Sequence, residues 1–427
     1  MRTLIKRGHV LDPGKLDGKF DLLVEDGKIR EIRPEILAEN VDRTVDATGL
    51  LVVPGLIDLH VHFREPGQEY KETIQTGCEA AARGGFTAVC TMPNTVPPND
   101  GPEVTSYILE KARVANGVRV HPVAAISRGL RGEELCEFAA LKAAGAVAVS
   151  DDGMPVRDAR MMRRALEYAK GFDLLVMSHS EELSLSAGGA MNEGETATRL
   201  GLPGIPNAAE SVAVMRDIAL AELTGARLHI AHVSTAESVR AIREAKLLRG
   251  ARVTAETAPH YFSLTDQAVE NYNTHAKMNP PLRTGRDREA IREALADGAL
   301  DAIATDHAPH APLEKEVEFD RAANGVIGLE TSLPVSLKLV SDGLLSMEAL
   351  VTRMSIAPAR ILGIDNRLTV GNPADITMID PEMRWTVDAR DFASKGRNTP
   401  FDGWPVRGRA VATVVEGRFV WDMLSSN

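Results

Sequence analysis

Eight short runs of apolar, strand-forming residues recur through the middle of the chain, and most are followed by an alanine-rich, charged stretch of helical character. The runs are predicted at 55–60, 85–92, 118–124, 146–150, 173–179, 227–233, 251–256 and 301–306, with helices at 73–83, 133–144, 159–170, 210–223 and 235–248. Eight strand–helix units over about 300 residues predict a parallel (β/α)8 barrel of the TIM type. An open, doubly wound sheet is the alternative that this pattern leaves.

The two ends of the chain differ from this middle because both are rich in short β-type runs. Near the N-terminus these runs lie at 4–6, 21–25 and 28–32, and the Asp26-Gly27 pair is a strong hairpin signal. Near the C-terminus they lie at 374–379 and 410–420, with a turn at Glu416-Gly417. We therefore predict an α/β protein in which residues 1–54 and 363–427 form a small composite β-sandwich domain and residues 55–362 form the barrel.

Ligand-type side chains stand where the predicted barrel strands end. They are His60, His62, Asp152, His179, His232 and Asp306. The first two are two residues apart, so both point the same way from one strand. Strand ends of a barrel converge on its C-terminal face, where barrel enzymes place their chemistry.

Imidazoles and carboxylates in this combination are typical ligands of zinc or a similar metal. Six ligands suit two ions that share a carboxylate and lie about 3.5–4 Å apart with a hydroxide between them. Asp151 and Asp152 compete for the shared place; Asp152 is preferred because it is nearer the barrel mouth, and Asp151 is then a hydrogen-bond acceptor behind it. We interpret His121, His229 and His275 as packed or hydrogen-bonded residues.

Further polar residues follow the same strand ends and indicate what is bound. They are Arg64, Asn94, Asn279 and His310. The guanidinium can fork onto a substrate carboxylate, and its alternative is a salt bridge to Glu65 or Glu69. The alternative for the two asparagines is turn capping, and for the histidine a place in a surface loop.

Two connections, at 180–209 and 308–328, are long for a compact barrel. Loops of this length usually act as lids or carry binding groups. The charged run at 314–318 fits either such a lid or a solvated surface.

Composition narrows the class of partner. The net charge is −11 at pH 7, which argues against nucleic acid, because phosphate contacts need clustered lysine and arginine. The three cysteines, Cys78, Cys90 and Cys136, show no CxxC spacing and fit reduced thiols. The first residues lack a signal-peptide pattern, and no apolar run approaches the roughly 18 residues of a membrane span. We predict a cytoplasmic protein that acts on a small molecule.

Several longer motifs strengthen this picture. They are DLHVHFREPG, GGFTAVCTMPNT, SDDG, MNEGETATRLGLPGIP, KMNPPLR, ATDHAPH and GNPADI. Together they resemble the dihydroorotase family of the bacterial class I type, within the amidohydrolase superfamily, over essentially the whole chain. The resemblance implies a zinc-dependent hydrolase of cyclic amide C–N bonds, which reversibly cyclises N-carbamoyl-L-aspartate to (S)-dihydroorotate in the third step of de novo pyrimidine (UMP) biosynthesis.

The resemblance also implies roles for residues. His60, His62 and Asp306 would hold one zinc, His179 and His232 the other, and Asp152 would bridge them, with no carboxylated lysine because SDDG contains none. Asp306 would be catalytic, taking a proton from hydroxide and passing it to the departing ring nitrogen. The substrate would be bound by His62, Arg64, Asn94, Asn279, His310 and, through the backbone, Asn324 and Gly325.

Two rival interpretations accompany the resemblance. A hydantoinase, dihydropyrimidinase or allantoinase would differ at the bridging aspartate or at Arg64. A catalytically inactive scaffold for aspartate carbamoyltransferase would lack metal ligands, whereas all six positions are filled here. A homodimer and a complex with that carbamoyltransferase are the protein partners that the resemblance suggests.

Overall fold

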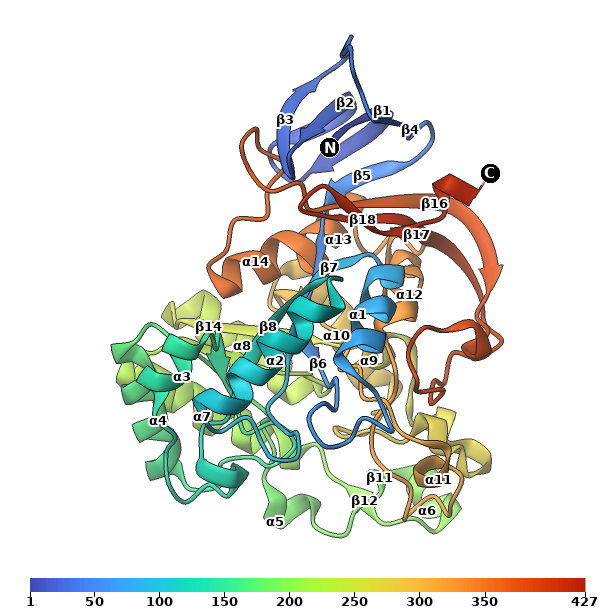
Figure 1. Cartoon of the computed structure of the whole chain (residues 1–427). Coiled ribbons are helices and arrows are strands. Elements are labelled where there is room, and N and C mark those ends of the chain that lie inside the picture. Colours follow the sequence, from blue (N-terminus) through green and yellow to red (C-terminus); the bar gives the residue numbers. More distant parts are fainter. Residues whose placement is uncertain (427) are drawn as a thin grey trace.

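A parallel barrel of eight strands forms the centre of the molecule in a computed structural model, which describes residues 1–426 (Figure 1). The strands are β6 (Leu56–Val61), β7 (Phe86–Thr91), β8 (Arg119–Ala124), β9 (Ala148–Val149), β10 (Leu175–Ser178), β13 (Leu228–Ile230), β14 (Val253–Thr257) and β15 (Ala302–Ile303). They are adjacent in chain order, and a bridge between Val61 and His307 links the first to the last. The predicted (β/α)8 barrel is confirmed.

Helices surround the barrel strands. The longer ones are α1 (Ile74–Gly84), α2 (Pro102–Ala115), α3 (Phe138–Ala144), α4 (Ala159–Gly171), α7 (Ala208–Thr224), α8 (Ala236–Arg249), α10 (Gly285–Asp297) and α12 (Leu329–Ser341). The five predicted helices are present, but the one predicted at 133–144 begins later than expected. The residues before it pair back with the preceding loop, since Ser127 bridges Leu135 and the Cys136 amide donates to the Ile126 carbonyl at 2.9 Å.

Short elements lie in the connections. They are α5 (Leu183–Ser186), β11 (Met191–Asn192), α6 (Glu195–Leu200), β12 (Gly204–Ile205), α9 (Pro259–Ser263), α11 (Pro312–Lys315), α13 (Met347–Val351) and α14 (Ala357–Leu362). Five of them, α5, β11, α6, β12 and α11, fall within the two long loops. Both long loops contribute to one apolar cluster that includes Met191, Tyr261, Met278, Phe319 and Val326. The loops are therefore packed together. The solvated-surface interpretation of the 314–318 run is wrong for Lys315, which is 2% exposed.

Residues from both ends of the chain form a second sheet of eight strands, at the top of Figure 1, where both termini also lie. Its strands are β1 (Arg2–Asp12), β2 (Leu16–Glu25), β3 (Lys28–Arg33), β4 (Arg43–Asp46), β5 (Leu51–Pro54), β16 (Ile376–Thr386), β17 (Pro405–Val415) and β18 (Arg418–Asp422). β5 joins the two halves, because it pairs with β1 on one side and β16 on the other. Side chains from both halves share one core, among them Ile5, Leu22 and Val414. The composite β-rich domain is confirmed, and its boundaries at 54/55 and 362/363 stay a prediction.

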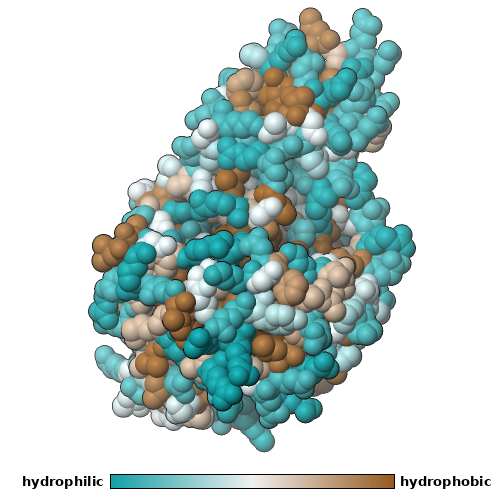
Figure 2. All heavy atoms as spheres, turned by 90° about the vertical axis from the view of Figure 1, so that its left-hand side faces the viewer, coloured by the Kyte–Doolittle hydropathy of each residue, from teal (hydrophilic) through white to brown (hydrophobic). Residues whose placement is uncertain are grey.

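The outer face around α3, α4 and α7 is mostly hydrophilic, with hydrophobic side chains in small separate groups (Figure 2). None of the helices in the described range is both long enough and apolar enough to cross a membrane. The three cysteines are all buried and free.

His121, in β8, is neutral in the folded protein. Burial, together with a smaller contribution from the nearby Arg119, lowers its pKa to about 4. An unfolded histidine titrates near pH 6.5, at about its ordinary pKa. As the pH falls from there, only the unfolded state takes up this proton, so folding stability declines towards pH 4. We expect His121→Gln to lose less melting temperature than the parent between about pH 7 and about pH 5, measured by circular dichroism. Equal losses in both proteins would contradict this assignment.

Candidate active site

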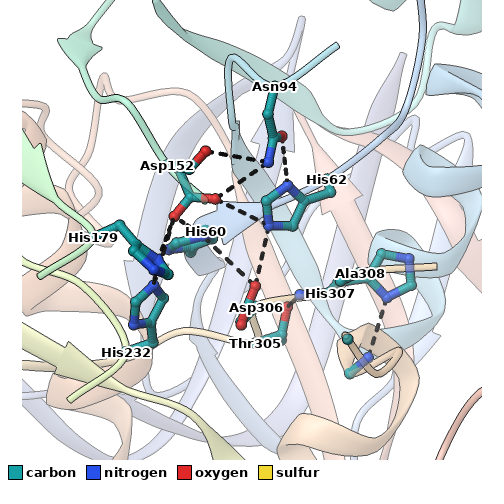
Figure 3. A network of polar contacts seen from close by, with 12 residues as sticks. His60, His62, Asn94, Asp152, His179, His232, Thr305, Asp306, His307 and Ala308 are labelled. Carbon is teal, nitrogen blue, oxygen red and sulfur yellow. Dashed lines mark hydrogen bonds and ion pairs between the residues drawn. The ribbon is translucent and has the colours of Figure 1, made fainter. Parts of the chain in front are cut away.

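Four imidazoles surround one carboxylate at the C-terminal face of the barrel (Figure 3). Oδ1 of Asp152 lies 3.3 Å from His60 Nε2, 3.5 Å from His179 Nδ1 and 3.6 Å from His232 Nε2. Oδ2 of Asp152 lies 3.5 Å from His62 Nε2. The carboxylate thus presents a different oxygen to His62 than to His179 and His232, which is the arrangement that a bridging ligand requires.

Asp306 completes the cluster from the end of the last strand. Its Oδ1 lies 3.1 Å from His62 Nε2 and 3.6 Å from His60 Nε2. Two sets of three residues have ligand atoms close enough together to hold an ion. The first set is His60, Asp152 and His232, and the second is His60, His62 and Asp306. The six predicted ligands are therefore brought together.

Asp151 lies next to the cluster in sequence but points away from it. Its Oδ1 accepts hydrogen bonds from the backbone amides of Ile126 at 2.8 Å and Ser127 at 3.0 Å, and its other oxygen accepts one from the Ser127 hydroxyl. The geometry thus favours Asp152 over Asp151 for the bridging place.

Hydrogen bonds behind the imidazoles decide which ring nitrogen is free. His60 Nδ1 lies 3.0 Å from Glu256 Oε1, and His62 Nδ1 lies 2.8 Å from Asn94 Oδ1. His179 Nε2 lies 3.0 Å from a carboxylate oxygen of Glu181. Because these oxygens can only accept, each of the three nitrogens carries a proton, and in the neutral ring the opposite nitrogen turns a lone pair towards the cluster.

Those lone pairs make the cluster fit a metal. His62 Nε2 faces oxygens of both Asp152 and Asp306, and His179 Nδ1 lies 2.8 Å from His232 Nε2. His60 Nε2 and Asp152 Oδ1 are buried and have no hydrogen-bond partner among the described residues. Ligand atoms without a hydrogen-bond partner are costly when buried, and cations placed among them would satisfy them.

The charges of both carboxylates and of His62 agree with ligand roles. Burial favours the neutral form of Asp152, but His60 and the other imidazoles around it hold its pKa well below the ordinary value. Burial likewise acts to raise the pKa of Asp306, and His62 and His60 outweigh it, so that this pKa is also lowered. Burial lowers the pKa of His62. Ionised carboxylates and a neutral imidazole are the forms that bind metals.

Carboxylates raise the pKa of two of the imidazoles, so metal binding there releases protons. Burial acts to lower the pKa of His60 and of His179, but Asp152 and the carboxylates behind the rings outweigh it. The pKa of His60 therefore lies well above its ordinary value, and that of His179 rises to about 10.

Three residues of the site have a left-handed backbone. The φ angles are 60° at Arg64, 36° at His232 and 48° at Asp306. Such conformations are uncommon for residues other than glycine and tend to occur at functional sites. They turn the chain sharply where each strand ends.

Arg64 lies beside the cluster and has no carboxylate partner within ion-pair distance in residues 1–426. It is 9% exposed, and its Nε donates to the Pro309 carbonyl at 3.3 Å. The alternative of a salt bridge to Glu65 or Glu69 is wrong, because neither carboxylate lies within ion-pair distance of Arg64. Glu65 pairs with Lys111 at 3.1 Å, and Glu69 accepts from the Gly67 amide at 2.8 Å. The guanidinium is therefore available to a substrate anion.

His310 and the asparagines occupy the rim of the same mouth. His310 is 8% exposed, so the surface-loop alternative is wrong; its Nε2 donates to the Asn324 carbonyl at 2.8 Å. Asn94 orients His62 and lies 3.4 Å from Asp152 Oδ2. Asn279 Nδ2 donates to Glu181 at 3.0 Å, and Glu181 in turn accepts from His179. Asn279 is thus linked to the cluster through Glu181.

Similarity to known proteins agrees with this geometry. A family described as dihydro-orotase-like matches residues 49–238. A dihydroorotase from Desulforapulum autotrophicum is 62% identical over 424 residues, covering 99% of both chains. One from Geobacter metallireducens is 56% identical over 423 residues, covering 99% of this chain and all of that one.

The chain belongs to the dihydroorotase family. Among solved structures, an L-hydantoinase from Arthrobacter aurescens superimposes with a TM-score of 0.88 at 28% identity, covering 99% of this chain and 96% of that one. A dihydropyrimidinase from Brevibacillus agri superimposes with a TM-score of 0.87 at 24% identity, covering 99% and 96%, and it supports the fold alone.

Two carboxylates of this dihydroorotase family member were missed from the sequence. Glu256 is the penultimate residue of β14, and it contacts both His60 and, at 3.2 Å, His229. Glu181 stands two residues after His179 and orients it. Two sequence signals indicate carboxylates that hydrogen-bond to metal ligands. One is a glutamate within a buried strand, and the other is a carboxylate two residues from a ligand. The hydrogen-bonded interpretation of His229 is confirmed.

Proposed function

We propose that this cluster holds two zinc ions bridged by Asp152 and catalyses the reversible cyclisation of N-carbamoyl-L-aspartate to (S)-dihydroorotate, in the third step of de novo pyrimidine biosynthesis. The full-length relatives named dihydroorotase support the reaction, and the hydantoinase-like fold supports a hydrolase of cyclic amides. The observation that carries the proposal is the place of Asp152, with its two oxygens turned to different imidazoles.

The proposed metal ligands follow the two halves of the cluster. One ion would be held by His60, His62 and Asp306, and the other by His179 and His232. When bound, a zinc pair of this kind supplies an activated hydroxide near neutral pH and polarises a carbonyl. Asp152 fills the bridging place, which leaves no role for a carboxylated lysine.

Asp306 is suited to move the proton in this reaction. Its carboxylate is buried and ionised, and it lies at the mouth beside His62. In the ring-opening direction it would accept a proton from the attacking water and deliver it to the departing ring nitrogen. In the cyclising direction it would take the proton of the ureido nitrogen and return it to the oxygen that leaves as water.

Arg64 and His310 are suited to bind the substrate α-carboxylate, together with Asn94. Burial lowers the pKa of His310 to about 3, with Arg64 and Lys71 adding to the effect. The Arg64 guanidinium is thus the main positive charge at the rim. Asn279 and the Asn324–Gly325 backbone would contact the rest of the substrate.

The rival interpretations are less well supported. Six ligand-type residues converge, so an inactive scaffold is not favoured. A homodimer, a complex with aspartate carbamoyltransferase and a cytoplasmic location remain proposals; the buried free cysteines are in keeping with a reducing compartment.

A metal-replete assay in both directions, with zinc counted per chain, tests the proposal. We expect turnover of dihydroorotate and of N-carbamoyl-L-aspartate with about two zinc ions bound, and little turnover of hydantoin or allantoin. Bound metal without dihydroorotate hydrolysis would refute the assignment.

Replacing Arg64 by methionine tests the substrate-anion site. The change removes the charge but keeps an apolar stem, so we expect KM for dihydroorotate to rise roughly 100-fold with a much smaller change in kcat. The exposed Arg252, changed to methionine in the same way, is the control and should leave KM unaltered. An unchanged KM in Arg64→Met would place the carboxylate elsewhere.

A further inference from the structure

Lys315 has a buried amino group that is surrounded by carbonyl oxygens. Burial lowers its pKa to about 7, and three acceptors around one nitrogen favour the ammonium form. It lies in α11, and its Nζ donates to the carbonyls of Lys277 at 3.2 Å, Ala323 at 2.7 Å and Gly325 at 3.1 Å. An ammonium has three donors, so all of them are used. The acceptors come from two separate segments, the one that precedes Asn279 and the late loop at 308–328. Lys315 therefore ties these two segments together.

Asn398 reaches the same loop from a distant part of the chain. It lies between β16 and β17 and is 2% exposed. Its Oδ1 accepts from the His310 amide at 3.0 Å, and its Nδ2 donates to the carbonyls of Ala308 at 2.9 Å and Gly325 at 3.0 Å. Its own carbonyl accepts from the Ile327 amide at 3.0 Å. One side chain thus holds both the start and the end of the loop.

The two contacts converge on Gly325. Its carbonyl accepts from both Lys315 and Asn398, and its amide donates to the Lys277 carbonyl at 3.0 Å. Its φ of +134° and the 2.7 Å that would separate an added Cβ from Ala308 Cβ exclude a side chain. The Asn324–Gly325 peptide is therefore held in one position against the His310 ring.

We propose that Lys315 and Asn398 are positioning residues, which act through the shared Gly325 carbonyl to hold His310 and the Asn324–Gly325 peptide in place for substrate binding. Neither side chain contacts a proposed metal ligand. The inference rests on the proposed function, in which His310 and this peptide face the substrate.

A double-mutant cycle tests the inference. Lys315→Met and Asn398→Leu remove the donors with little change in size, and each leaves buried carbonyls unpaired. We expect each to raise KM for dihydroorotate roughly tenfold to hundredfold, with kcat changed less than about threefold and zinc content unchanged. The double variant should fall short of the product of the two single effects, because both act on one carbonyl.

Matched controls separate positioning from folding. Asn366 donates to the Gly55 carbonyl at 2.7 Å at the other end of the barrel, so Asn366→Leu should lower the melting temperature without raising KM. Lys338 is 68% exposed and pairs with Asp342, so Lys338→Met should change neither the melting temperature nor KM. Hydrogen exchange should become faster for the amides of 308–328 in both test variants and stay slow in the barrel strands.

Several outcomes would overturn the inference. One is an unchanged KM in the folded Lys315→Met and Asn398→Leu variants. Another is a fall in kcat as large as the rise in KM. The third is a rise in KM in the double variant that equals the product of the two single effects. If a variant does not fold, Lys315→Gln, which cannot donate to all three carbonyls, and Asn398→Ser are measured in its place against the same criteria. His310→Ala separates failure of the proposed substrate site from failure of the positioning role. If His310→Ala leaves KM unchanged, the proposed substrate site is refuted. If it raises KM while the Lys315 and Asn398 variants do not, only the positioning role is refuted.

Discussion

The Asp306→Asn variant is expected to turn over dihydroorotate at least about 1,000-fold more slowly than the parent. An amide cannot accept the proton that the proposed mechanism gives to this carboxylate, and it is a poorer metal ligand. Asparagine is close in size and tolerates the left-handed φ of 48° at this position, so the backbone should be kept. Initial rates in both directions, with zinc counted per chain, measure the effect.

Asp301, directly before β15, provides the control for this change. Its carboxylate accepts from the Ala255 amide at 3.0 Å and pairs with Lys246 at 2.6 Å, far from the mouth of the barrel. We expect Asp301→Asn to lower stability and to retain activity. If Asp306→Asn kept more than about a tenth of the parent rate with its metals bound, Asp306 would not be the proton carrier.

The second large effect is expected from Asp152→Asn. The change removes the negative charge between the imidazoles and the pair of equivalent oxygens that a bridge needs. We expect bound zinc to fall from about two ions per chain to one or fewer, and kcat to fall at least about 100-fold. Metal analysis after dialysis, together with steady-state rates, measures both quantities.

The neighbouring Asp151 offers a matched comparison. Because it holds the backbone of Ile126 and Ser127, Asp151→Asn should lower the melting temperature while zinc content stays near that of the parent. The opposite pattern, with zinc lost from Asp151→Asn and kept in Asp152→Asn, would show that the bridge is assigned to the wrong aspartate.

The barrel and its ligands could be predicted because their signals are local. Each ligand stands within a residue or two of the end of an apolar run, and parallel strands carry such ends to one face. His60 and His62 illustrate this, since two-residue spacing on a strand suffices to aim both rings at one point. The β-rich ends were also predictable, although β4 and β5 are too short and irregular to stand out.

Contacts between distant segments could not be predicted from one sequence. Nothing near Asn398 indicates that it binds the His310 amide, 88 residues earlier. Lys315 sits in a run of charged residues that is typical of a surface, and only the carbonyls of Lys277, Ala323 and Gly325 explain its burial. The start of α3 was misjudged for a similar reason, because pairing of 135–136 with 126–127 overrides helix propensity.

The central place of β5 also affects the order in which the protein can be assembled during synthesis. β5 is complete once residue 54 leaves the ribosome, but its antiparallel neighbour β16 begins more than 300 residues later, at Ile376. Until then one edge of β5 has no backbone partner, while the barrel between them has all its strands. Exposed strand edges promote misassociation of nascent chains. A stalled or truncated product that ends before residue 376 would therefore carry a finished barrel beside an open sheet, and that open edge would be the part of it most prone to misassociate.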